Sequence, residues 1–256
     1  MKQCTLTVLA GIVYSIALIA GGAQGNEIGA RIGTRTLTPA NLLDGTVRLR
    51  TRTIERDYTV KTGWGAAFAV DLSKYGLVSS RYLLTAAHLI NTSHGQIMPR
   101  GDLEIEVDTD TWAPCKVVAM DQVRDLCLIE SSVRLPVVSK ISTSDDTQHL
   151  GEKVVIVGCP RGVPPCVSRG TLTDFEPPVS GVRWQAAAQF NHGNSGGPVY
   201  NALTGSVIGV AVAGIADGFG EMRPDTALFA PYTEVCRFLD VAIATGALAR
   251  PRSRRR

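Results

Sequence analysis

From residue 45 onward, short apolar runs alternate with turns rich in glycine, proline and polar side chains. We expect strands where Val, Ile and Leu gather, because β-branched residues favour pleated, half-buried positions. Such runs occupy residues 47–49, 66–70, 82–84, 103–107, 115–120, 126–129, 154–157, 171–173, 183–187, 199–200, 207–212 and 228–229. Many short strands at this spacing predict an all-β barrel or sandwich.

A polar segment, residues 139–149, divides the pattern into two halves. We therefore expect one β unit over residues 45–138 and a second over residues 150–230. The stretch before them, residues 26–41, is polar and weakly patterned, and no element is predicted there.

One helix is predicted over residues 231–246. Its apolar positions recur at the i, i+3, i+4, i+7 spacing of a single helical face. They are Val235, Phe238, Leu239 and Ala242. Thr233 is the expected N-terminal cap, and Gly246 is the expected end.

The composition is that of a globular protein, with 45% hydrophobic and 19% charged residues. The net charge of +3 comes from the end of the chain, because five of the 26 basic residues are arginines in the last seven positions. Without them 21 basic residues face 23 acidic ones. We expect residues 249–256 to form a solvated basic tail, with at most weak contacts to nucleic acid, anionic lipid or an acidic partner.

The first 25 residues have the pattern of a secretory signal peptide: a basic start at Lys2, an apolar middle and small residues at the end. Cleavage after Ala23 or Gly25 fits this pattern. The alternative is an uncleaved membrane anchor, since the length of the apolar stretch is close to that of a membrane-spanning helix, about 20 residues. Either interpretation places the rest of the chain outside the cytoplasm, as a secreted or periplasmic protein.

Cysteine spacing predicts no metal site, because neither a CxxC pair nor a Cys/His cluster is present. Five cysteines remain after the leader, and an odd number cannot all pair within one chain. They are Cys115, Cys127, Cys159, Cys166 and Cys236. A disulfide between Cys159 and Cys166, which flank a proline-rich turn, is compatible with an oxidising compartment.

Three segments carry candidate chemistry: LLTAAH ending at His88, DLCLI beginning at Asp125, and GNSGGP with Ser195 at its centre. A serine hydroxyl needs a base to take its proton, and a neutral imidazole titrates in the right range. A carboxylate then orients the imidazole and stabilises its cation. The backbone N–H groups of Gly193 and Ser195 are the candidate oxyanion hole, each donor contributing about 3 kcal/mol.

Each residue alone is weak evidence, and two rivals exist. Asp121 lies four positions before Asp125, but the position of Asp125 at the start of an apolar strand favours it. His192 is close to Ser195 and could act as a second base, although an exposed loop side chain is the simpler interpretation. The three segments together, in the order His, Asp, Ser, predict a catalytic triad.

These segments resemble the signature blocks of the chymotrypsin-like serine proteases, and within them the HtrA/Deg type. Further similarity lies at residues 63–68, 157–162 and 228–231, so that the resemblance covers roughly residues 45 to 245. It implies two six-stranded antiparallel barrels with the site between them, His88 and Asp125 from the first barrel and Ser195 from the second. It also implies a serine endopeptidase that acts on protein or peptide substrates without a cofactor.

The chain departs from that family in two places. Too few residues follow the predicted helix for a PDZ domain, so we expect the protease domain without one. Asn194 replaces the aspartate that pairs with a freed N-terminus in digestive zymogens, so we expect activity without such a cut.

By resemblance, the substrate pocket is lined by Gln189, Phe190, His192 and Ala213. With no acid at Gln189, this lining favours small or medium apolar residues over Lys or Arg. Two alternatives stay open: a pseudoprotease that binds partners on the same fold, and a tail-driven nucleic-acid or capsid-associated protein that cleaves itself. The sequence does not predict an oligomeric state.

Overall fold

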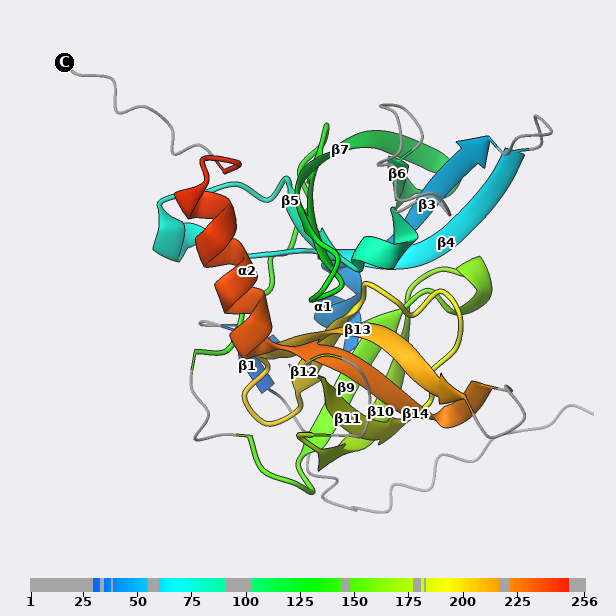
Figure 1. The fold of residues 1–256 in the computed structure, drawn as a ribbon, viewed down its shortest axis with the longest axis vertical. Helices are drawn as coiled ribbons and strands as arrows, with labels where there is room; N and C mark the ends of the chain where they lie inside the picture. Colours follow the sequence, from blue (N-terminus) through cyan, green and yellow to red (C-terminus); the bar gives the residue numbers. More distant parts are fainter. Residues whose placement is uncertain are drawn as a thin grey trace, which may run out of the picture.

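The computed structural model describes residues 30–32, 35–37, 39–54, 60–90, 103–143, 148–176, 181, 183–216 and 222–248. Within them the chain forms two closed antiparallel β-barrels, one above the other in Figure 1. Each barrel has six strands, which confirms the predicted all-β, two-barrel fold. The proposed signal peptide (residues 1–25) and basic tail (residues 249–256) lie outside the described residues.

Neighbouring strands of each barrel are hydrogen-bonded in a closed circuit. The first barrel runs in the order β3 (Thr46–Ile54), β4 (Val60–Ala69), β5 (Tyr82–Thr85), β8 (Leu126–Ser131), β7 (Thr111–Asp121) and β6 (Leu103–Asp108). The second runs in the order β10 (Cys166–Asp174), β11 (Trp184–Ala188), β14 (Met222–Pro231), β13 (Val207–Ala216), β12 (Pro198–Asn201) and β9 (Lys153–Gly158).

Strand β8 shows why its apolar run is continuous rather than alternating. Successive side chains of a strand point to opposite faces. Cys127 and Ile129 pack inside the first barrel, whereas Leu126 and Leu128 pack in a second cluster shared with the other barrel. Because both faces are buried over residues 126–129, every position of this run is apolar, and Asp125 directly precedes it.

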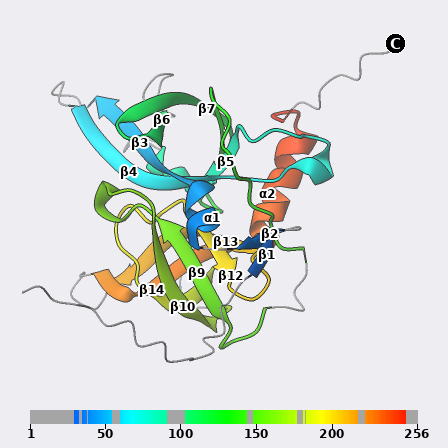
Figure 2. The same cartoon turned by 180° about the vertical axis from the view of Figure 1, so that it is seen from behind.

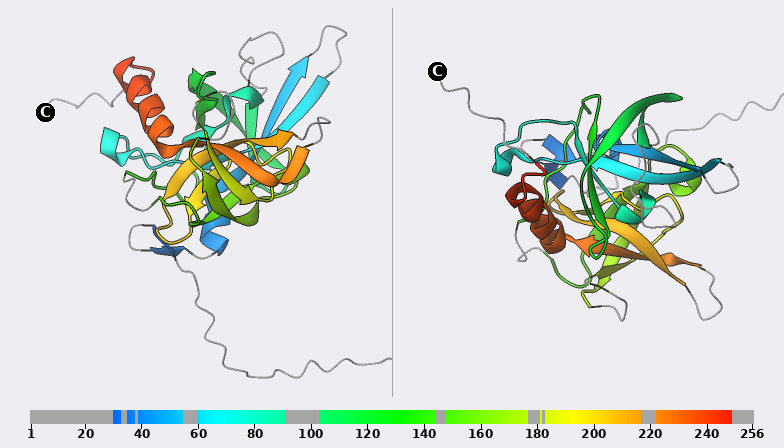
Figure 3. Two further views of the ribbon diagram at one scale, coloured as in Figure 1. Left: turned by 60° about the horizontal axis from the view of Figure 1, so that its bottom comes forward. Right: turned by 45° about the horizontal axis from the view of Figure 1, so that its top comes forward.

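Helix α2 (Tyr232–Ala244) packs on the same junction with the face predicted from the sequence. The four residues predicted for that face belong to the cluster shared by the barrels, and the helix lies along one edge of the molecule (Figures 1 and 3). Among the described residues no helix is both long and apolar enough to cross a membrane.

The predicted cap of α2 is wrong. Thr233 lies inside the helix, and the N-cap position is Pro231, which provides no side-chain hydrogen bond. Strand β14 leads directly into the helix, so the chain turns two residues earlier than the sequence suggested. Gly246 follows the last turn with a φ of 74°, which agrees with its predicted role at the helix end.

The segment before the barrels has more structure than its sequence predicted. Strands β1 (Ala30–Ile32) and β2 (Arg35–Leu37) form a small two-stranded sheet. Helix α1 (Pro39–Asp44) follows and places Leu42 in the cluster between the barrels. Figure 2 shows α1 at this junction.

Candidate functional site

Strand β5 delivers His88 to the boundary between the barrels. Thr85 ends the strand fully buried, and its hydroxyl donates to the carbonyl oxygen of Ala66 at 2.7 Å. Ala86 and Ala87 follow, both buried, and a single turn of 3-10 helix, η2 (Ala87–Leu89), begins there. The small alanines let the backbone stay in the core while the His88 side chain remains 46% exposed.

Asp125 binds His88 at two points. The backbone N–H of His88 donates to Oδ1 at 2.8 Å, and Nδ1 of its ring lies 2.8 Å from Oδ2. Asp125 itself has a φ of 56°, in the left-handed region, as the last residue of the turn before β8. A carboxylate at Nδ1 holds the ring proton on that nitrogen, which leaves Nε2 with its lone pair as a base.

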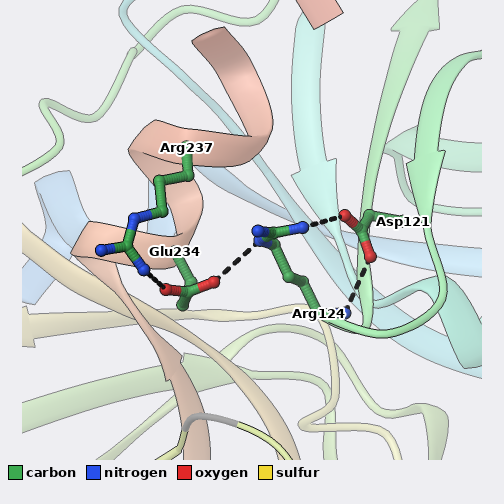
Figure 4. A network of polar contacts seen from close by, with 4 residues as sticks. All are labelled: Asp121, Arg124, Glu234 and Arg237. Atoms are coloured by element: carbon green, nitrogen blue, oxygen red, sulfur yellow. Dashed lines mark hydrogen bonds and ion pairs between the residues drawn. The ribbon is translucent and has the colours of Figure 1, made fainter. Parts of the chain in front are cut away.

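Asp121, the rival acid, has a different partner. Arg124 donates to it twice, from the backbone N–H at 2.9 Å and from Nη1 at 2.6 Å (Figure 4). Burial raises the pKa of Asp121, but these hydrogen bonds outweigh it and hold the pKa below its usual range. Asp121 is thus an ionised partner of Arg124, and the contacts of His88 are with Asp125.

Arg124 also ties this turn to helix α2. Its Nε donates to the buried carboxylate of Glu234 at 2.7 Å, and Arg237 binds the other oxygen of the same carboxylate (Figure 4). The residue directly before Asp125 is therefore held from two sides.

The turn around Ser195 is shaped by its glycines. Gly193 has a φ of 96°, and a Cβ placed on it would collide with the carbonyl oxygen of Cys159. Among the described residues, the N–H groups of Asn194 and Gly196 have backbone acceptors, whereas those of Gly193 and Ser195 have none. Two neighbouring N–H groups without acceptors are what an oxyanion hole requires.

Direct contacts dock this turn on the first barrel. The N–H of Ala66 donates to the carbonyl oxygen of Ser195 at 2.8 Å. Gly196 approaches so closely that a Cβ there would collide with the backbone of Ala66 and the hydroxyl of Thr85. Since Thr85 is three residues before His88, the same contacts bring the two candidate segments together.

The Ser195 hydroxyl is not joined to His88 in this structure. Ser195 is buried, and its Oγ donates to the carbonyl oxygen of Val212 at 3.2 Å. Among the described contacts, His88 and Asp125 form one hydrogen-bonded pair, and Ser195 belongs to a separate one.

The predicted pocket residues lie on either side of Ser195 in the chain. Gln189 and His192 are exposed and Ala213 is partly buried. Phe190 is only 2% exposed and packs in the interior cluster of the second barrel. The pocket stays a prediction.

The cysteines are free thiols in the described structure, including Cys159, which is buried, and Cys166, which is exposed. Burial raises the pKa of Cys159 to about 12, with a smaller effect from Cys166. The suggested disulfide between them is therefore absent here. Among the described residues, no group of three or more His, Cys, Asp or Glu side chains could hold a metal ion.

Two contacts near the site were not predicted from the sequence. Arg48 donates to the carbonyl oxygen of Gly162 at 2.5 Å, and Val212 accepts from Ser195. Arg48 belongs to an alternating run of arginines in β3, whose partner strand β6 carries alternating glutamates. That pattern predicts outward ion pairs, but not the contact with the second barrel.

The sequence is similar to those of known serine proteases. The family model of the trypsin-like peptidase domain matches residues 68–210. A probable periplasmic serine endoprotease DegP-like of Chlamydia trachomatis is 26% identical over 180 residues, 66% of this chain and 34% of the relative. Serine protease HTRA1B of Danio rerio is 28% identical over 185 residues, 68% of this chain and 35% of the relative.

A third relative is the putative serine protease HhoB of Synechocystis, 31% identical over 157 residues, or 58% of this chain. The chain spans about a third of the length of these three relatives, 34%, 35% and 35%.

Proposed function

The chain belongs to the trypsin-like peptidase family, and from this membership we propose that it is a serine endopeptidase with His88, Asp125 and Ser195 as its triad. The observation that carries the proposal is the two-point hydrogen bonding of His88 by Asp125, 2.8 Å at each point. It is the arrangement that leaves Nε2 free to accept a proton.

In the proposed reaction, Oγ of Ser195 attacks the carbonyl carbon of the scissile peptide while Nε2 of His88 takes its proton. The new oxyanion accepts hydrogen bonds from the N–H groups of Gly193 and Ser195. His88 then gives the proton to the leaving amine, and an acyl-enzyme remains on Ser195. Water repeats the sequence and releases the acid. No step calls on a cofactor.

Attack requires the Ser195 hydroxyl to exchange one partner for another. Its hydrogen bond to Val212 O, at 3.2 Å, is replaced by one to Nε2 of His88. A serine side chain moves between staggered rotamers by rotation about one bond, and we propose that this rotation makes the exchange. The hydrogen bond to Val212 also favours the second candidate, a pseudoprotease in which Ser195 is never activated.

We propose that the substrate is a protein or peptide with a small or medium apolar residue before the scissile bond. Gln189 is uncharged and exposed, and Ala213 lies one residue after the carbonyl that binds Ser195. Hydrolysis of Val, Ala or Leu substrates should exceed that of Lys or Arg substrates. The opposite order in a panel of peptides would contradict this preference.

We propose that the protein acts outside the cytoplasm, in the periplasm or after secretion. Residues 1–25 support this with their signal-peptide pattern, and relatives are named as periplasmic proteases. Mass spectrometry of the protein from its native host should give a mature N-terminus near residue 24 or 26. An intact N-terminus in a membrane fraction would instead favour the anchor.

The proposed function is tested by incubating the purified protein with a mixture of unstructured peptides and identifying the products by mass spectrometry. The parent should generate new internal termini that Ser195→Ala does not, and the acylated Ser195 should be trapped at low pH. Equal products from both proteins would contradict the proposal. No products from a folded parent would favour the pseudoprotease.

A further inference from the structure

Arg48 joins the outside of the first barrel to the turn that follows β9 in the second. Its Nη1 donates to the carbonyl oxygen of Gly162 at 2.5 Å, and its Nη2 donates to Glu106 at 2.5 Å. The guanidinium lies 5.2 Å from the ring centroid of Trp64 and 5.1 Å from that of Trp112. Figure 1 shows this lime-green turn beside β4, the strand that carries Trp64.

The same turn, η3 (Pro160–Gly162), holds the backbone of the candidate oxyanion hole. The N–H of Arg161 donates to the carbonyl oxygen of His192 at 2.6 Å. The N–H of Cys159 donates to the carbonyl oxygen of Gly193 at 3.2 Å. In a trans peptide the C=O and N–H point in opposite directions, so fixing the His192 carbonyl fixes the direction of the Gly193 N–H.

We propose that Arg48 is a positioning residue for the oxyanion hole, acting through the η3 turn on the N–H of Gly193. The inference rests on the proposed function, in which that N–H stabilises the oxyanion. Arg48 touches no reacting atom. It fixes the turn that fixes the His192–Gly193 peptide, and a small rotation of that peptide would aim the N–H away from the developing charge.

Several contacts fix the direction of Arg48 itself. Its side chain is 15% exposed, and its Nε is buried with no hydrogen-bond partner among the described residues. The guanidinium is therefore held by the carboxylate of Glu106, the carbonyl of Gly162 and the two indole rings. The planar guanidinium of Arg can stack on aromatic rings while it donates to two different acceptors, which the compact ammonium of Lys cannot do in the same way.

Four variants test the proposal. Arg48→Met keeps an apolar side chain against the two indole rings but removes both donors, and Arg48→Lys restores one donor. Glu106→Gln keeps an acceptor and removes the charge that orients Arg48. Arg52→Met is the matched control, since Arg52 lies on the same strand and binds Glu104 at 2.6 Å.

We expect Arg48→Met to lower kcat on a peptide substrate about 10- to 100-fold, with KM within about threefold of the parent. Arg48→Lys and Glu106→Gln should have intermediate kcat values, and Arg52→Met should match the parent. A folded Arg48→Met protein with the parent's kcat would overturn the proposal. If Arg48→Met does not fold, the other two variants decide. The proposal is overturned if Arg48→Lys and Glu106→Gln both have the same kcat as the parent.

Hydrogen exchange separates this proposal from the proposed function. In Arg48→Met the amides of residues 159–163 and 191–195 should exchange faster than in the parent and in Arg52→Met. If the parent cleaves no peptide, the proposed function fails, and exchange alone decides the role of Arg48. Faster exchange confined to these two segments supports positioning, and unchanged exchange there overturns it.

Discussion

The carbonyl oxygen of Ser195 accepts a hydrogen bond from the backbone N–H of Ala66 at 2.8 Å, so the candidate nucleophile is docked on the first barrel by its own backbone. Ala66 also accepts the hydroxyl of Thr85, the residue that leads the chain to His88. These two contacts with Ala66, both in the core, connect the segment of Ser195 to the segment of His88.

The role of Asp125 predicts a large effect from a small change. In Asp125→Asn an NH2 group replaces one of the two carboxylate oxygens that accept from His88. The imidazole ring then loses the tautomer that leaves Nε2 free. We expect kcat on a peptide substrate to fall by about 10⁴-fold. The matched control is Asp121→Asn, the same substitution four residues earlier, which should leave kcat within about threefold. Equal losses in the two variants would contradict the assignment of Asp125.

Gly193 should tolerate no side chain. Its φ of 96° and the collision of a Cβ with Cys159 O predict that Gly193→Ala costs about 2–4 kcal/mol in the free energy of unfolding and abolishes hydrolysis. Gly76 is the control, because it has a φ of 76° and no atom within 4 Å of a Cβ.

Gly76→Ala should cost only about 1 kcal/mol and keep full activity. Chemical denaturation and peptide hydrolysis measure both effects. An active, stable Gly193→Ala protein would show that this turn does not have the described geometry.

The pairing of Asp121 with Arg124 predicts a dependence of stability on pH. Because the folded-state pKa of Asp121 lies below the usual value, its contribution is fully present above about pH 4 and is lost as the pH falls further. Denaturation curves should therefore show the parent more stable than Asp121→Asn at pH 7, with the difference shrinking below pH 4. A difference that stays constant down to pH 2.5 would contradict the pairing.

The free cysteines predict a pattern of thiol reactivity. Ellman's reagent at pH 8, without reductant, should modify the exposed Cys166 first and the partly exposed Cys236 more slowly. Burial raises the pKa of Cys115 and Cys159 to about 12 each, so these two should react only after unfolding. Cys166→Ser should lose the fast phase. If additional thiols of the unfolded protein react only after a reductant is added, the protein contains a disulfide, and the prediction of free thiols is contradicted.

The sequence predicted the strands well, because each depends on local pattern. The run from Leu126 to Ile129 is apolar at every position, which predicted a strand, and the structure buries both of its faces. The alternation along β11 also extends past its end: Ala188 is buried, Gln189 is exposed and Phe190 is buried. Period-two counting could therefore have placed Phe190 in the core.

The contacts that connect the barrels could not be predicted in this way. Arg48 and Gly162 are 114 residues apart, and Arg124 and Glu234 are 110 residues apart. Their meeting depends on how the barrels pack, which no local pattern encodes. The cap of α2 failed for a related reason, since the path of β14 into the helix, rather than the preference of Thr233, sets where the helix begins.

The most direct test of the central claim is labelling by a fluorophosphonate, which reacts only with an activated serine. The purified mature protein should be labelled on Ser195, whereas Ser195→Ala and His88→Ala should not, with all three equally folded by circular dichroism. Labelling of the parent alone is the predicted result. A folded parent that stays unlabelled, or that is labelled as fast as His88→Ala, would contradict the account of Ser195 as a nucleophile activated by His88.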